Sequence, residues 1–350
     1  MAIAACAACS SYEGSFVDCE VACTPSTGCP PGFECSTPEG VCRAVGVSTP
    51  CSSLPGEYSS CTGLAETCGP GANDDCCAPA TTIPGGTFYR SYDAAADDYN
   101  DMGYPATTSP FVLDKYEVTV GRFRRFVTAG MGTQTSAPVM GAGSRTLNGS
   151  PSQGGWDASW NASLATNTTA LVASVKCHSM YQTWTDTPGA NENLPINCIT
   201  WQEAMAFCIW DGGHLPTEVE WNFAASGGSD QRAYPWSNPA VSTIIDCTYA
   251  NYAGPCAGAT NRVGSVSPKG DGKWGQSDLG GNVFEWVLDW YATPYRTPCN
   301  DCANLTPTSE RVTRGASFNI VSYVRAAYRA YAAPVFRGID LGVRCARTVP

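Results

Sequence analysis

The sequence is poor in charge and has no long apolar run. Charged residues make up 15% of the 350-residue chain, well below the roughly 25% of an average soluble domain. The excess of acidic residues gives a net charge of −11, which argues against nucleic acid or an anionic membrane as the main partner. No run of 18 apolar residues occurs, so the sequence predicts no transmembrane segment.

Histidine is also scarce, with only His178 and His214 in the whole chain. No Gly-x-Ser-x-Gly motif occurs, so hydrolysis by a serine with a histidine base is not indicated. Two carboxylates lie close together in LPTEVEW, at Glu218 and Glu220. Helix capping and pairing with the helix dipole explain this spacing better than general acid–base catalysis does.

Cysteine, in contrast, is abundant. The chain has 20 cysteines, an even number that allows full pairing and indicates an oxidising, extracellular or cell-surface location. Twelve of them lie in residues 1–80, where little else could form a core. We therefore predict that 1–80 is a small segment held by disulfides. Zinc is not favoured, because both histidines lie elsewhere and no paired Cys-x-x-Cys arrangement occurs. The pairing within 1–80 cannot be deduced from spacing.

The first six residues, Met-Ala-Ile-Ala-Ala-Cys, are similar to the end of an apolar export signal. The order Ile-Ala-Ala-Cys also resembles a bacterial lipoprotein processing site, in which Cys6 would carry a lipid anchor. The alternative interpretation is that Cys6 is an ordinary disulfide cysteine.

Residues 83–350 differ in composition and are predicted to form one compact domain. Three threonines stand before segments with helical apolar spacing, namely Thr119, Thr200 and Thr217. A glutamate follows the second and the third of them by three residues, which is the pattern of a capping box. Short strands are expected around 111–116, 261–266, 312–318 and 341–346. The polar stretch 130–170 is expected to be a surface excursion.

Seven short blocks of this domain resemble the formylglycine-generating enzyme family, also called the sulfatase-modifying factor family. They are IPGGTF (83–88), FVLDKYEVTVGRF (111–123), LPINCITWQEAMAFCIWDGGHLPTEVEWNFAASGG (194–228), YPWS (234–237), DLGGNVFEWVLDWY (278–291), RGASF (314–318) and LGVRCA (341–346). The resemblance covers roughly residues 83–347. It implies an α+β fold that is irregular, loop-rich and related to C-type lectins, in proteins that are usually exported and often bind calcium.

The resemblance stops at the family's catalytic cysteines. Enzymes of this family oxidise a sulfatase cysteine to formylglycine, and two cysteines near their C-terminus bind copper(I), a soft ion suited to thiolates. The corresponding stretch here is 319–340, and no cysteine occurs between Cys302 and Cys345. We therefore expect no copper and no copper-dependent oxidation. A second branch of the superfamily holds iron with three histidines, which a chain with two cannot supply.

A structural calcium ion is a further implication of the resemblance. Its ligands would be the side chains of Asp278 and Glu285 and the carbonyl oxygens of Gly281 and Val283, a set of hard donors. The alternative is that Glu285 forms a salt bridge with an arginine. A second family site would use Asn251, although the loop that carries its acidic partner, AGPCAGATN, is differently composed here.

The family also has a cysteine pair at positions matching Cys208 and Cys345, which implies a disulfide between them. Two further pairs are suggested by proximity in sequence, Cys177 with Cys198 and Cys247 with Cys256. Cys299 and Cys302 form a Cys-x-x-Cys in an Asn/Asp-rich loop. Redox motifs of this spacing usually lie at the N-terminus of a helix. We therefore interpret this pair as a structural disulfide.

The C-terminal stretch 314–347 combines arginines with aromatic residues, a composition favoured on recognition surfaces. The family pattern suggests that Arg325, Arg329 and Arg344 are structural. The residues left over are predicted to line a groove for a peptide, protein or glycan ligand, and they are Asn319, Tyr323, Tyr328, Tyr331 and Phe336.

Three hypotheses about function follow. The first is a secreted or surface-anchored binding protein whose sulfatase-modifying-factor-type domain is non-catalytic. The second is an oxidoreductase of the same family that oxidises cysteine by a variant mechanism. The third is a structural component of the cell envelope, which the cysteine-rich N-terminal segment would favour.

Overall fold

A computed structural model describes residues 58–78, 81–256, 258–320 and 324–349, together with the backbone of two short strands near the N-terminus. The chain divides into two compact units, Met1–Gly56 and Glu57–Pro350. In the first unit, β1 (Phe33–Ser36) and β2 (Val41–Ala44) pair antiparallel, with Cys35 opposite Cys42. The prediction of a lipid anchor at Cys6 lies outside the described residues.

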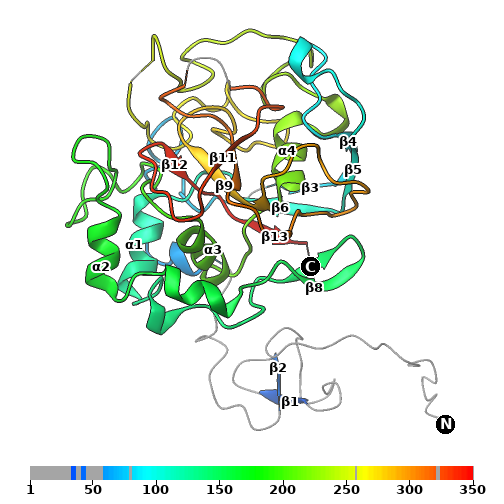
Figure 1. Ribbon diagram of the computed structural model, residues 1–350. Coiled ribbons are helices and arrows are strands. Elements are labelled where there is room, and N and C mark those ends of the chain that lie inside the picture. Colours follow the sequence, from blue (N-terminus) through cyan, green and yellow to red (C-terminus); the bar gives the residue numbers. More distant parts are fainter. Residues whose placement is uncertain are drawn as a thin grey trace, which may run out of the picture. The chain divides into compact units, whose positions relative to one another are not determined.

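The second unit is organised around one central strand, β9 (Phe284–Trp290). It lies in a four-stranded sheet of order β11-β10-β9-β12 (Figure 1). Antiparallel pairs join β9 to β10 (Arg311–Arg314) and β10 to β11 (Ala330–Ala332). The short strand β12 (Leu341–Gly342) runs parallel to β9 on its other side. The C-terminal stretch 314–347 therefore supplies both edge strands of this sheet, β11 and β12.

Four α-helices surround this sheet, and three of them begin where the threonines predict. They are α1 (Val120–Thr128), α2 (Thr168–Ser174), α3 (Trp201–Trp210) and α4 (Glu218–Ser226). Oγ1 of Thr119 accepts a hydrogen bond from a backbone N–H in the first turn of α1. Both predicted capping boxes are formed, at the starts of α3 and α4. The capping signals of the sequence are thus confirmed.

Side chains of β9 enter two separate hydrophobic cores. Trp286 and Leu288 pack into a core built largely from α1 and α3. Val287, between them in sequence, packs into a second core with residues of α4, including Trp221. Since neighbouring residues of a strand point to opposite faces, β9 is buried on both sides. Figure 1 shows α3 and α4 on either side of this strand.

A second sheet pairs the last strand of the domain with two of its first strands. Its order is β13-β6-β3, with β6 (Phe111–Leu113) antiparallel to both β3 (Thr82–Ile83) and β13 (Ala346–Thr348). Two hairpins complete the strands, β4–β5 (Gly86–Tyr89 and Pro105–Thr108) and β7–β8 (Arg145–Leu147 and Ser150–Gln153). Short 3-10 helices occupy Ser59–Cys61, Asp97–Tyr99, Gln134–Ser136, Ala158–Ser163 and Gly228–Asp230. None of the helices in the described ranges has the length and apolar character that crossing a bilayer requires.

Two expectations about the domain are corrected. Residues 261–266 form turns rather than a strand. The stretch 130–170 is not simply a surface excursion, because Trp156 and Leu164 are inserted into the core with α1 and α3. These apolar side chains anchor a segment whose average composition is polar.

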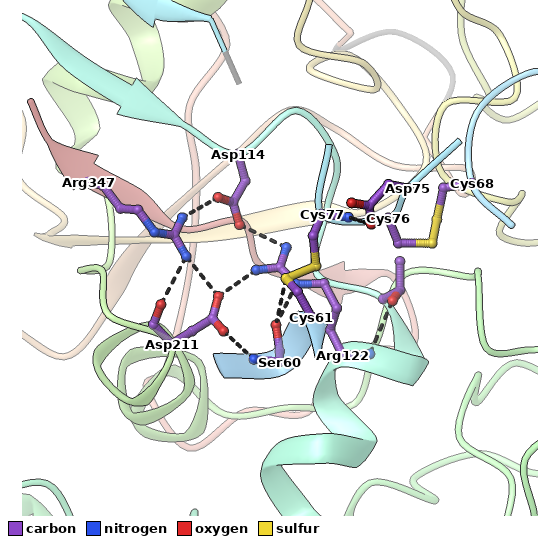
Figure 2. The surroundings of a disulfide bond; sticks show 11 residues. Ser60, Cys61, Cys68, Asp75, Cys76, Cys77, Asp114, Arg122, Asp211 and Arg347 are labelled. Carbon is purple, nitrogen blue, oxygen red and sulfur yellow. Dashed lines mark hydrogen bonds and ion pairs between the residues drawn. A yellow bond between two sulfur atoms is a disulfide. The ribbon is translucent and has the colours of Figure 1, made fainter. Parts of the chain in front are cut away.

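The large unit also begins earlier than the expected boundary at 80–83. Figure 2 shows Ser60 beside a buried group of four charged side chains, contributed by Asp114, Arg122, Asp211 and Arg347. Arg122 donates to Asp114 at 2.9 Å and to Asp211 at 2.6 Å, and Arg347 bonds to the same two carboxylates. Ser60 accepts from Nε of Arg122 and donates its backbone N–H to Asp211. The cysteine-containing residues 58–78 are therefore part of the large unit.

Candidate functional site

The arginines of the C-terminal stretch are tied to carboxylates of other elements. Arg329 donates to both oxygens of Glu218 at the start of α4, at 2.6 and 2.8 Å. Burial alone would raise the pKa of Glu218, but Arg329 and Arg314 outweigh this effect and hold the pKa below its ordinary value. Arg325 pairs through one nitrogen with Oδ2 of the buried Asp93. These arginines fix the path of the backbone.

Arg344 and Glu285 form the most deeply buried of these pairs. Both side chains are fully buried, and Arg344 donates to the two carboxylate oxygens at 2.7 to 2.9 Å. Trp221 adds a third donor, with its indole Nε1 at 2.7 Å from Oε2 of Glu285. The carboxylate is therefore fully engaged by protein groups.

This engagement bears on the predicted calcium site. Glu285 does not fit as a calcium ligand, because Arg344 and Trp221 use its oxygens and the pair is already neutral. Asp278 accepts from the N–H of Gly264 at 2.6 Å, and Oδ1 of Asn251 is buried without a hydrogen-bond partner. Within the described ranges, no three His, Cys, Asp or Glu side chains are grouped so that they could hold a metal ion. Calcium binding through Asp278, Gly281 and Val283 alone is not tested by this geometry, and the engaged Glu285 argues against it.

Six disulfides pair all twelve cysteines from Cys61 to Cys345. Four of them join the partners named in the sequence analysis, Cys177–Cys198, Cys208–Cys345, Cys247–Cys256 and Cys299–Cys302. Two more lie in the segment before residue 78, Cys61–Cys77 and Cys68–Cys76 (Figure 2). Cys208 lies in α3 and Cys345 just before β13, so their bond joins the first core to the C-terminal stretch.

Strand β11 and the loop between it and β12 carry outward-facing apolar side chains. Tyr331, Val335 and Phe336 are 50%, 61% and 52% exposed. The loop is nonetheless well held, because the N–H of Trp201 donates to the carbonyl of Pro334 at 2.9 Å. Large apolar side chains exposed together on a fixed loop are typical of a binding surface.

The five predicted ligand-binding residues do not all belong to this loop. Phe336 does, whereas Tyr331 lies in β11, just before the loop. Asn319 is exposed on the turn after β10, and Tyr328 is half-buried with its ring 6.4 Å from that of Phe284. Tyr323 lies outside the described residues.

A second loop, residues 178–181, adds side chains that the sequence analysis missed. The disulfide Cys177–Cys198 fixes its beginning. Asn197 fixes its end, since Nδ2 donates both to the carbonyl of Tyr181 and to that of Ile339. The ring of Tyr181 lies 6.0 Å from that of Phe318. The two loops are therefore held together by a single amide side chain.

Met180, in this second loop, is 74% exposed. We call the side chains of Met180, Tyr181, Phe318, Tyr331, Val335 and Phe336 the aromatic surface, in which Phe318 is buried and packs against Tyr181. The only signal for the second loop in the sequence was its flanking cysteine. The aromatic surface offers apolar contact area. The sequence places neither cysteine nor histidine between residues 303 and 344, so this stretch supplies no thiolate or imidazole.

Comparison with known proteins agrees with this architecture. The family model described as "Sulfatase-modifying factor enzyme 1-like domain" matches residues 70–349. The formylglycine-generating enzyme of Thermomonospora curvata is 28% identical over 303 residues, covering 75% of this chain and 91% of that protein. A protein of Bos taurus named inactive C-alpha-formylglycine-generating enzyme 2 is 28% identical over 291 residues, covering 75% of this chain and 86% of its own length.

Among solved structures, PvdO from Pseudomonas aeruginosa is similar in fold. It superposes with a TM-score of 0.53 at 21% sequence identity, covering 77% of this chain and 94% of the PvdO chain.

Proposed function

Because the chain belongs to the sulfatase-modifying factor enzyme 1-like family, we propose that it is a non-catalytic binding member of that family. It is exported, and is either secreted or held at the cell surface. Its ligand is a peptide, a protein or a glycan, bound at the aromatic surface. The observation that carries this proposal is the exposure of Tyr331 in β11 and of Val335 and Phe336 on the rigidly held loop that follows it.

Rigidity matters because a ligand gains affinity when the receptor needs no ordering on binding. The loop between β11 and β12 is held by the backbone contact to Trp201 and by the pairing of Arg337 with Glu203. Tyrosine and phenylalanine supply large contact area at low conformational cost. A preformed aromatic surface of this kind suits recognition.

The missing thiolates support a non-catalytic role. Copper(I) needs soft ligands, and the stretch from 303 to 344 contains no cysteine. All cysteines from Cys61 onward are taken up in disulfides, which also favours an oxidising location outside the cytosol. A relative of similar identity bears the name of an inactive enzyme, so loss of activity has a parallel in this family.

Peptide and glycan arrays probed with the purified full-length chain test the proposal. The affinity for any ligand found is then measured by calorimetry for the wild type and for Tyr331→Ala and Phe336→Ala. We expect each variant to bind at least about tenfold more weakly, as at central aromatic contacts of an interface. Met140→Ala is the matched control, since Met140 is 78% exposed on another loop. Equal affinity of all four proteins would refute the proposal.

Oxidation of cysteine by a variant mechanism is the second candidate function. It is favoured by the near full-length similarity to a protein named formylglycine-generating enzyme. The aldehyde product on a cysteine-containing peptide would identify it, and its formation would replace the binding proposal.

A further inference from the structure

A cavity of about 290 Å³ is lined by residues other than those of the aromatic surface. None of the six side chains of that surface lines it. Its charged and aromatic lining includes Arg90, Glu218, Asp289, Tyr295, Arg296 and Arg329. The disulfide Cys299–Cys302 borders it through Cys302.

The carboxylates of this cavity are already used by protein groups. Asp289 accepts one backbone N–H on each oxygen, from Glu218 at 2.7 Å and from Asn304 at 2.6 Å. Glu218 binds Arg329 with both oxygens and also accepts from the hydroxyl of Tyr295 at 3.0 Å. Glu218 is thus paired with Arg329, whereas Asp289 is held only by neutral N–H donors and keeps its charge. The lining therefore has three arginines and two carboxylates, an excess of one positive charge.

The contacts of Arg90 differ from those of Arg329, because none of them is to a carboxylate of the described residues. It is 5% exposed, and its side chain donates to the carbonyl of Arg296 at 2.8 Å and toward the sulfur of Cys302 at 3.7 Å. Its guanidinium lies 4.4 Å from the ring centre of Tyr295. Its Nε is buried without any hydrogen-bond partner. Across the described ranges, Arg90 forms no ion pair with a carboxylate.

Arg296 adds a second cation without a counterion. Its side chain lines the cavity and is exposed at the surface, and it pairs with no carboxylate of the described chain. A buried guanidinium that lacks a counterion is energetically costly. An anion entering the cavity would remove this cost, and the planar donor fork of arginine is well suited to oxyanions.

We propose that this cavity is a binding site for a small oxyanion, the carboxylate, sulfate or phosphate group of a ligand. Arg90 supplies the fixed donor at the inner wall, oriented by Tyr295 and Cys302. Arg296 supplies the exposed donor at the mouth. The site is independent of the aromatic surface, so it stands whether or not that surface binds a peptide or a glycan.

Thermal unfolding of the full-length protein at constant ionic strength tests the proposal, with sodium acetate, sulfate or phosphate exchanged for chloride. We expect a saturable rise of Tm with at least one of the three anions. A saturable rise of Tm with acetate alone would identify a site for carboxylates. A rise with sulfate or phosphate alone would identify a site for tetrahedral oxyanions. Both outcomes support the site, and a Tm that responds to no anion in a saturable way overturns it.

Variants separate binding from general salt effects, which stabilise most proteins in sulfate. Arg296→Gln should raise the apparent Kd at least about fivefold, and Arg90→Lys should do the same through loss of the donor fork. Arg125→Gln is the control, because it removes the same charge from an exposed arginine outside the cavity. If Arg90→Lys does not fold, Arg296→Gln decides alone. An unchanged Kd in Arg296→Gln contradicts the proposal.

Discussion

Arg337 joins the exposed loop of the aromatic surface to the first turn of α3. Its two terminal nitrogens donate to the two oxygens of Glu203 at 2.7 and 2.6 Å, and Glu203 is completely buried. The same carboxylate closes the capping box with Thr200. One side chain thus starts a helix and orients the loop that carries Val335 and Phe336.

Arg337→Met should therefore destabilise the fold and weaken ligand binding together. It leaves the Glu203 carboxylate buried without its cation, which we expect to cost about 3 kcal/mol of unfolding free energy. Urea denaturation measures this loss. Lys176→Met is the control, since its pair with Asp186 is exposed and should contribute less than about 1 kcal/mol. Equal losses in the two variants would show that the Arg337 pair is not structural.

The two disulfides Cys208–Cys345 and Cys247–Cys256 should differ in their contribution to stability. Their sequence separations are 137 and 9. By the chain-entropy relation, removing the first should cost about 5 kcal/mol and removing the second about 3 kcal/mol. Double alanine variants compared by urea denaturation check the order. A larger loss for Cys247→Ala/Cys256→Ala would contradict it.

Stability should fall below pH 6.5 because of His214. Its pKa is lowered by burial and by the nearby Arg145, while Glu220 acts in the opposite direction. The unfolded chain, with a histidine pKa of about 6.5, takes up a proton that the folded chain does not. The histidine contribution is thus fully present above that pH and is lost as the pH falls toward the folded pKa, by at most about 1.4 kcal/mol per pH unit.

Unfolding free energies of the wild type and His214→Gln between pH 5 and 8 measure this effect. The variant should show the weaker pH dependence. His178→Gln, at an exposed position, should behave like the wild type. The same slope in all three proteins would rule out His214 as the source.

Removal of calcium should leave the stability unchanged, because Glu285 is neutralised by Arg344. We expect the same Tm in excess EDTA and in millimolar calcium. In contrast, Glu285→Gln should cost about 3 to 5 kcal/mol, since it leaves Arg344 buried without a counterion. A Tm that rises with calcium would show that an ion is bound after all, through Asp278 and the neighbouring carbonyls.

Helices α1, α3 and α4 could be predicted from the sequence, whereas α2 and β9 could not. A capping box involves only four consecutive residues, so the sequences that begin at Thr200 and Thr217 predict the starts of α3 and α4. The strand Phe284–Trp290 is buried on both faces, so it lacks the alternation of apolar and polar residues that marks a half-buried strand.

The candidate site shows the same division between local and long-range information. The family resemblance identified Arg325, Arg329 and Arg344 as structural, and each pairs with a carboxylate. It could not separate the exposed Tyr331 from the half-buried Tyr328, because that depends on where β11 lies. Arg344 and Glu285 lie 59 residues apart, so the local sequence pattern could not reveal that they form a pair.

The most direct test of the account is a copper(I) titration of the purified chain under anaerobic conditions. A cysteine-containing sulfatase peptide and oxygen are then added, and the peptide is analysed by mass spectrometry. We predict no stoichiometric retention of copper against a competing chelator, and no formylglycine in the peptide. One tightly bound copper ion per chain together with formation of the aldehyde would contradict the proposal that this domain keeps the family's fold without its catalyst.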